Sequence, residues 1–249
     1  MLGIIVQARL GSTRLPNKMT LPFHENLGVL EIILNKIKNN LTDIPLVVAT
    51  TTAGKDDAIV GICRANNIDY YRGSEENVLS RFIETAEKYN FSKIIRVCAD
   101  NPFLDITYLK ELIVKFNDSN LDYLSYKTSK DKPTILTHYG FWTEAVSLEA
   151  LKSVLNSTKD ALYLEHVTNY IHSTLNNFNM ELIQIPIEIE KVENLRLTLD
   201  TEGDYKLLKE IYTDCQSNSL STSLAIVKFI EQNKGWLSQM KEQIKLNTK

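Results

Sequence analysis

One stretch near the N-terminus decides the fold: GIIVQARLGSTRLPNK, residues 3–18. Its first four residues are apolar and predict a buried strand, and the polar loop that follows carries three cations, Arg9, Arg14 and Lys18. In open α/β sheets, ligands bind where loops leave the carboxyl ends of the strands. Exposed backbone N–H groups in the turn at residues 11–13 can hold phosphate oxygens, and Arg and Lys add positive charge. The stretch therefore predicts a strand followed by a phosphate-binding loop. It matches neither of the two common glycine-rich phosphate motifs.

Along the rest of the chain, short apolar runs alternate with longer amphipathic stretches, which is typical of a sheet with crossover helices. In the first half we expect strands at residues 3–6, 45–50, 69–72 and 93–98, and helices at 28–39, 55–66 and 75–89. In the second half we expect strands at 123–126, 182–187 and 195–199, and helices at 147–155, 163–175, 204–212, 221–233 and 235–245. Because such crossovers favour parallel pairing, we predict an α/β fold with a mostly parallel central sheet flanked by helices.

Composition excludes several classes of protein. The net charge is -3, and no basic face of the kind that nucleic-acid binding needs is evident. Cys63, Cys98 and Cys215 are too scattered for a disulfide framework or a zinc site, so we expect reduced thiols. The N-terminus lacks a signal-peptide pattern, and no stretch is apolar and long enough to cross a membrane. These features favour a cytoplasmic enzyme.

Two aspartates stand at the ends of predicted strands. Asp100 follows the strand at 93–98 and precedes Asn101-Pro102, and Asp200 follows the strand at 195–199. Both carboxylates would then lie at the sheet edge that carries the basic loop, where hard divalent cations find the oxygen ligands they prefer. Asp100 could instead be a turn or cap residue, and we expect Asp105 to be the N-cap of the next helix. Together, two remote carboxylates and a cationic loop predict a site for Mg²⁺ and a polyphosphate.

At this point the chain resembles a known family, the cytidylyltransferases of spore-coat polysaccharide synthesis, which are similar to 3-deoxy-manno-octulosonate and acylneuraminate cytidylyltransferases. The resemblance covers about residues 3–212 and implies a Rossmann-like nucleotide-diphospho-sugar transferase fold of the glycosyltransferase-A type. The motifs that carry it are the loop 7–18, Arg72-Gly73-Ser74 with Val78-Leu79 and Arg81, Asp100-Asn101-Pro102, Glu165-His166-Val167-Thr168, and Leu199-Asp200-Thr201 with Asp204.

The resemblance implies roles for individual residues. The residues around the triphosphate would be Ala8, Arg9, Ser12, Arg14 and Lys18, and those along the base and ribose would be Thr50, Gly73, Ser74 and Arg81. Asp100 and Asp200 would hold Mg²⁺ and, with Arg14 and Lys18, form the catalytic set. Two positions depart from the family pattern: relatives often have Gly where Asn17 stands and Thr-Gly where Cys98-Ala99 stand. Asn tolerates unusual backbone angles, so the loop is expected to survive the first change.

The same resemblance assigns acceptor recognition to the second half of the chain. The expected acceptor-binding residues are Asn101, Tyr139, Glu144, Glu165, His166 and Arg196. His166 could equally be a buried helix histidine, and Phe141-Trp142 could be either core or a platform for a sugar. We expect one domain over residues 1–249, with a nucleotide-binding half at 1–120, an acceptor-binding half at 121–215 and C-terminal helices at 216–249. Relatives often form homodimers, and a homodimer is compatible with the sequence.

Three functions compete at this stage. The first is a Mg²⁺-dependent cytidylyltransferase that couples CTP to a sugar phosphate or polyol phosphate, or to an ulosonic acid, and releases pyrophosphate; Arg196 and the spare cations favour a phosphate-bearing acceptor. The second is a glycosyltransferase of the same fold, which would normally carry an Asp-x-Asp motif that Asp100-Asn101-Pro102 does not match. The third is a catalytically silent binding protein, which the presence of Lys18, Asp100 and Asp200 argues against.

Overall fold

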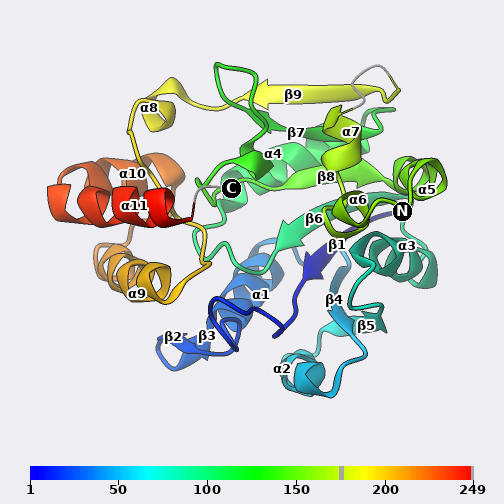
Figure 1. Ribbon diagram of the computed structural model, residues 1–249, viewed down its shortest axis with the longest axis horizontal. Helices are drawn as coiled ribbons and strands as arrows, with labels where there is room; N and C mark the ends of the chain where they lie inside the picture. The colour runs from blue at the N-terminus through cyan, green and yellow to red at the C-terminus, as the bar shows by residue number, and fades with distance from the viewer. Residues whose placement is uncertain (174–176, 248–249) are drawn as a thin grey trace.

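A seven-stranded sheet forms the centre of the computed structural model (Figure 1), which describes residues 1–173 and 177–247. Its strand order is β5-β4-β1-β6-β8-β7-β9. The strands are β1 (Leu2–Gln7), β4 (Leu46–Thr51), β5 (Asp69–Gly73), β6 (Lys93–Cys98), β7 (Tyr123–Lys127), β8 (Glu144–Ser147) and β9 (Met180–Gln184). The short strands β2 (Pro22–His24) and β3 (Leu27–Gly28) form a separate antiparallel pair.

The first four strands of this order are parallel, as the sequence predicts. β1 pairs with β4 on one side and with β6 on the other, and β4 pairs with β5. Their carboxyl ends therefore lie at one edge of the sheet. β8 runs antiparallel to both β6 and β7, whereas β7 and β9 are parallel to each other. The mostly parallel sheet is confirmed, and one reversed strand separates its two halves.

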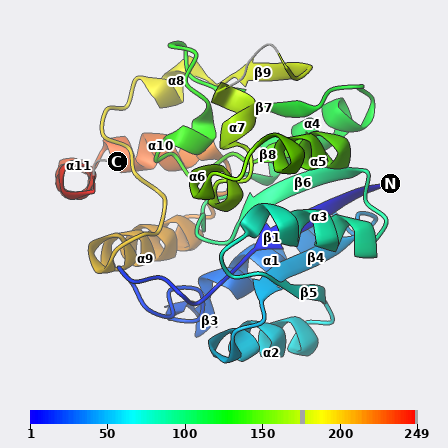
Figure 2. The ribbon, with the colours of Figure 1, turned by 45° about the vertical axis from the view of Figure 1, so that its right-hand side comes forward.

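Helices cover both faces of the sheet. One apolar core is shared by the helices on the first face and at its border. These are α1 (Val29–Asn40), α2 (Asp57–Ala65), α4 (Ile106–Asn117), α9 (Glu202–Ser217), α10 (Ser223–Glu231) and α11 (Lys234–Leu246). On the other face, α3 (Val78–Lys88), α5 (Leu148–Ser157) and α7 (Asn169–Ser173) share a second core, and Figure 2 shows α3 and α5 in front of the sheet. Short elements complete the list: η1 (Gly54–Asp56), η2 (Thr134–Leu136), α6 (Ala161–Glu165) and α8 (Ile187–Glu190).

Local signals explain several helix boundaries. Asp105 is the N-cap of α4, as predicted, because its carboxylate accepts a hydrogen bond from Thr107 N at 2.8 Å. Thr201 caps α9, and Asp204 completes a capping box. Among the described residues, no helix combines the length and apolar character needed to cross a bilayer.

The second half of the chain departs from the predicted elements in four ways. The predicted strand at 195–199 is extended but belongs to no sheet, because Leu197 N donates to His138 O and Leu199 N donates to Asp100 O, which are two different loops. The predicted strand at 182–187 ends at Gln184, and α8 begins at Ile187. The predicted helix at 163–175 is divided into α6 and α7; its positions 174–175 lie outside the described residues. Strand β8 is not predicted, because its four residues are too few to form a pattern.

Candidate active site

The loop after β1 is held in place by a buried carboxylate. Leu10 N donates to Asp56 Oδ1 at 2.7 Å, and Asp56 is fully buried and also accepts from the Thr51 hydroxyl. Farther along, Asn17 adopts a left-handed backbone with φ of 57°, and its carbonyl accepts from Thr20 N and Leu21 N. Asn takes this conformation more readily than most residues, so the turn forms without the glycine that relatives often have here.

Lys18, Asp100 and Asp200, three residues predicted to form the site, lie together. Lys18 Nζ lies 3.0 Å from Asp100 Oδ2, 3.9 Å from Asp200 Oδ1 and 2.8 Å from the carbonyl oxygen of Leu199. The ammonium is nearly buried, since the Lys18 side chain is 11% exposed. Asp100 follows β6 and Asp200 precedes α9, so the two carboxylates that reach Lys18 are 100 residues apart in sequence. The sequence prediction that these groups converge is confirmed by the geometry.

Two further guanidinium groups fix Asp200. Arg14 Nη2 lies 3.1 Å from Asp200 Oδ1, and Arg196 Nη2 lies 3.1 Å from Oδ2. Arg196 is itself locked by both oxygens of Asp204, at 2.7 and 2.8 Å. Each carboxylate at this site is therefore neutralised by a cation that can also bind phosphate.

Two adjoining cavities open on these carboxylates. The smaller, about 330 Å³, is lined by the loop after β1, including Arg9, Ser12 and Arg14. The larger, about 560 Å³, is lined by β6, by the segment 132–142 and by the α6–α7 turn. Gln7, Cys98, Asp100 and Asp200 line both. The arrangement offers room for two small molecules, one in each cavity, on either side of Asp100 and Asp200.

The residues expected along the base and ribose lie beyond the smaller cavity. Gly73, Ser74 and Arg81 lie together, because Arg81 Nη1 donates to Ser74 O at 2.6 Å and a side chain at Gly73 would meet Arg81 Cγ at 3.0 Å. Burial, helped by the charge of Arg9, lowers the pKa of Arg81 to about 10. Thr50 is fully buried. Neither these four residues nor Ala8 line the two cavities.

The expected acceptor residues divide into two groups. Asn101, Glu165 and His166 line the larger cavity, and Glu165 Oε1 lies 3.0 Å from Arg9 Nη2 at its border with the smaller one. Tyr139 lines a neighbouring cavity of about 390 Å³. Glu144 and Arg196 are each 1% exposed and lie behind the larger cavity. They line neither the larger nor the smaller cavity. The expectation of direct acceptor contact is corrected for these two, because buried partners consume their polar atoms; Arg196 therefore gives no support for a phosphate-bearing acceptor.

The polar residues of the larger cavity that sequence reasoning missed include Gln7, Arg96, Lys132 and His138. Arg96 had a recognisable signal, since it is a charged residue inside the apolar run at 94–97. His138 and Lys132 lie in a segment without periodicity, so no pattern indicated them. Because an Arg side chain can only donate, His138 Nδ1 must accept the 2.9 Å hydrogen bond from Arg196 Nη1. The proton of neutral His138 is then on Nε2.

Metal ligands and thiols complete the chemistry of the site. Among residues 1–173 and 177–247, no group of three or more His, Cys, Asp or Glu side chains could hold a metal. Two converging carboxylates suit Mg²⁺, which usually takes one or two carboxylates and completes its shell with phosphate and water. The described cysteines are free, as expected, and burial raises the pKa of Cys98 to about 11, so its thiol is protonated at neutral pH and is a poor nucleophile.

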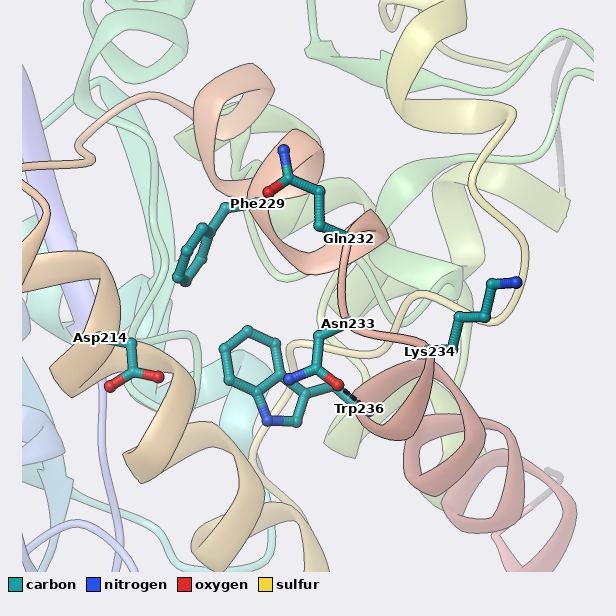
Figure 3. Close-up of a pocket in the computed structure, with 6 residues that line it drawn as sticks. All are labelled: Asp214, Phe229, Gln232, Asn233, Lys234 and Trp236. Atoms are coloured by element: carbon teal, nitrogen blue, oxygen red, sulfur yellow. Dashed lines mark hydrogen bonds between the residues drawn. The ribbon is translucent and has the colours of Figure 1, made fainter.

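A further hollow lies away from this site. Figure 3 shows it between α9 and the α10–α11 turn, where the rings of Phe229 and Trp236 lie edge to face, with Asp214 on one side and Lys234 on the other. Its apolar rings and single pair of opposite charges offer no cluster of cations for a polyphosphate. The candidate site is therefore the pair of cavities at Asp100 and Asp200.

Comparison with known proteins decides the family. The cytidylyltransferase family profile matches residues 3–241. The chain belongs to the cytidylyltransferase family. The chain is therefore a CTP-dependent nucleotidyltransferase.

Individual relatives agree with this assignment. The enzyme is 30% identical to the spore coat polysaccharide biosynthesis protein SpsF of Bacillus subtilis over 92% of its own length and 93% of that protein. It is similar to the solved structure of a cytidylyltransferase from Leptospira borgpetersenii, with a TM-score of 0.79, 26% identity and coverage of 95% and 96% of the two chains. The fold also matches CMP:2-keto-3-deoxy-manno-octonic acid synthetase solved with CTP, with a TM-score of 0.62, 13% identity and coverage of 86% and 98%. The predicted resemblance and fold are confirmed.

Proposed function

We propose that the enzyme uses Mg²⁺ to transfer the cytidylyl group of CTP to a sugar-type acceptor in surface polysaccharide synthesis, with release of pyrophosphate. The acceptor is a sugar or polyol phosphate, giving a CDP-linked product, or an ulosonic acid, giving a CMP-linked one. The observation that carries the proposal is the convergence of Lys18, Asp100 and Asp200 where the two cavities meet. SpsF, whose name places it in polysaccharide synthesis, supports the product class.

The smaller cavity would hold the triphosphate. Arg9, Arg14 and Lys18 surround it and would compensate the charge that develops on the departing pyrophosphate. Asp100 and Asp200 would hold Mg²⁺, which supplies Lewis-acid stabilisation of phosphate charge when bound. Binding exchanges partners: the cations release the carboxylates and take phosphate oxygens. Arg196 stays on Asp204 and keeps Asp200 in place throughout.

The larger cavity would hold the acceptor with its nucleophilic oxygen toward Asp100 and Asp200. That oxygen forms a bond to the α-phosphorus, while the bond from the α-phosphorus to the bridging oxygen of the β-phosphate breaks. Positioning and charge compensation carry most of such phosphoryl transfers, so the protein needs no nucleophile of its own. The base and ribose would extend toward Gly73, Ser74 and Arg81.

A pyrophosphate-release assay tests the proposal. Each of the four nucleoside triphosphates is offered with a panel of sugar phosphates, polyol phosphates and ulosonic acids, with Mg²⁺ and with EDTA. The expected result is release with CTP, Mg²⁺ and one class of acceptor. Release that is independent of the acceptor, or undiminished in EDTA, would refute the proposed reaction.

A further inference from the structure

Arg96 is a charged residue in the middle of the sheet that faces the larger cavity. It lies on β6 between apolar neighbours and is 7% exposed. Glu144 on the adjacent strand β8 is its direct cross-strand partner, and the two side chains form a buried ion pair. Of the two, only Arg96 lines the cavity, together with Gln7 and Trp142, and Glu144 lies behind it.

The contacts of Arg96 leave part of its donor capacity unused. A guanidinium carries five N–H donors. Nη1 donates to Glu144 Oε2, Nη2 donates to Gln7 Oε1 at 3.2 Å, and Nε has no partner within the described part of the chain. The ring of Phe82 covers the guanidinium from the helix side, with 5.9 Å between Cζ and the ring centre. A buried group with unmet donors is costly unless a ligand completes its hydrogen bonds.

Glu144 is held as firmly as Arg96. The hydroxyl of Tyr123 donates to Glu144 Oε1, and Thr168 Oγ1 lies 2.9 and 3.2 Å from the two carboxylate oxygens. His172 Nε2 lies 3.2 Å from the Tyr123 hydroxyl. Buried ion pairs often stabilise a fold no better than apolar residues of equal size. A pair fixed by so many bonds at the wall of a substrate cavity therefore points to a role in binding.

We propose that Arg96 binds an anionic oxygen group of the acceptor, a carboxylate or a phosphate, and that Glu144, Tyr123 and Thr168 are positioning residues that aim it. This inference rests on the proposed transfer reaction, since it assigns the acceptor to the larger cavity. A guanidinium grips either group through paired donors. Lys132 lines the same cavity and adds a second positive charge. Neutral polyols alone would not satisfy this site.

Trp142 provides a local reporter for the test. The chain has two tryptophans, and only Trp142 lines the larger cavity, so Trp236→Phe leaves its fluorescence as the sole tryptophan signal. In this background, inorganic phosphate, glycolate and neutral ethylene glycol are titrated with MgCTP present, so that the triphosphate loop is filled. A saturable response to one anion and none to ethylene glycol is expected. A response to phosphate then indicates a phosphate-bearing acceptor, and a response to glycolate indicates an acceptor with a carboxylate.

The variant Arg96→Gln should lower the affinity for that anion by about 10- to 100-fold, because one pair of charge-assisted hydrogen bonds is lost. Arg64→Gln, at an arginine hydrogen-bonded to Tyr70 outside the cavity, is the matched control and should change nothing. If Arg96→Gln fails to fold because Glu144 is left unpaired, the double variant Arg96→Gln/Glu144→Gln removes both charges and should show the same loss. Unchanged anion affinity in either folded variant, or an equal response to ethylene glycol, would overturn the proposal.

Positioning is tested with Tyr123→Phe and Thr168→Val, which keep the ion pair but remove its supports. The anion dissociation constant should rise about 3- to 10-fold in each. A merely structural role would lower the melting temperature and leave this constant unchanged. Calorimetric titration of MgCTP separates the two proposals. If the parent protein does not bind MgCTP, the proposed transfer reaction is wrong. The anion titration, repeated without nucleotide, still tests whether Arg96 binds the anion.

Discussion

At the scale of residues, the site is a set of charges that satisfy one another until substrate arrives. Lys18 occupies the point between Asp100 and Asp200, and Arg14 and Arg196 complete the neutralisation of Asp200. The carboxylates would otherwise repel each other, so the cations stabilise the arrangement of the loop. In the proposed reaction, a metal on the carboxylates would free the cations for the triphosphate, and the triphosphate would free the carboxylates for the metal.

Lys18→Ala should lower turnover by about 10²- to 10³-fold, because one preorganised cation at the pyrophosphate is lost. The fold should survive, since the Lys18 side chain lines the smaller cavity and belongs to no helix or strand. Steady-state pyrophosphate release checks the rate, and circular dichroism checks the fold. Lys38→Ala is the control: it removes an exposed lysine that donates to Asn66 O at 2.7 Å, far from the loop. Near-normal release from Lys18→Ala would exclude Lys18 from the proposed role.

The lowered pKa of Glu144 should make the stability of the fold depend on pH. Burial alone would raise its pKa, but Arg96, His172 and Tyr123 together lower it from 4.5 to about 2. Ionised Glu144 therefore stabilises the folded state fully above pH 4.5, and this stabilisation disappears as the pH falls toward 2. It amounts to about 3 kcal/mol at most.

Urea unfolding between about pH 5 and pH 2.5 measures this effect. Glu144→Gln should lose less unfolding free energy than the parent over that range, by about 2–3 kcal/mol. Glu149→Gln, at a carboxylate that is 83% exposed, should follow the parent curve. Parallel curves for Glu144→Gln and the parent would show that Glu144 titrates normally in the folded protein.

At the scale of elements, the parallel half of the sheet was predictable and the acceptor side was only partly so. Buried strands such as β1 and β6 have continuous apolar runs bounded by polar loops, which is a strong local pattern. β8 is four residues long, and the segment 195–200 is extended without joining a sheet. Both are fixed by long-range contacts, which no local pattern records.

The same limit applies to the candidate site. The loop residues and the two aspartates follow strand ends, so topology alone brings them together. The placement of Arg196 and Glu144 behind the cavity depends on which polar partner each finds, Asp204 or Arg96. Sequence shows that these side chains are polar and near the site, but only packing determines which of them faces the substrate.

Gly140 is a test at the level of elements, because it lets segment 195–199 lie against the cavity wall. It has φ of 71°, and a Cβ atom there would lie 2.7 Å from Leu197 O. Gly140→Ala should therefore destabilise the protein by about 1–3 kcal/mol in urea unfolding. Gly61→Ala, within α2 and with no atom within 4 Å, should stabilise it by about 0.5–1 kcal/mol. Equal effects of the two changes would contradict the packing described for Gly140.

At the scale of the whole molecule, the sheet divides the work between two halves of one chain. β1 and its loop supply the cations, β6 supplies Asp100 and Arg96, and the segment before α9 supplies Asp200. The 3.0 Å ion pair between Arg9 and Glu165 joins the two cavities across 156 residues of sequence. In the proposed reaction, nucleotide and acceptor would therefore meet where β1 and β6 end.

The central claim is that Asp100 and Asp200 pass from cations to a metal as the triphosphate binds. Calorimetric titration of CTP with Mg²⁺ and with EDTA tests it most directly, on the parent and on Asp100→Asn. The account predicts that Mg²⁺ tightens CTP binding at least about tenfold in the parent, an interaction of about 1.4 kcal/mol, and much less in Asp100→Asn. Equal CTP affinity with and without Mg²⁺ in the parent protein would contradict it.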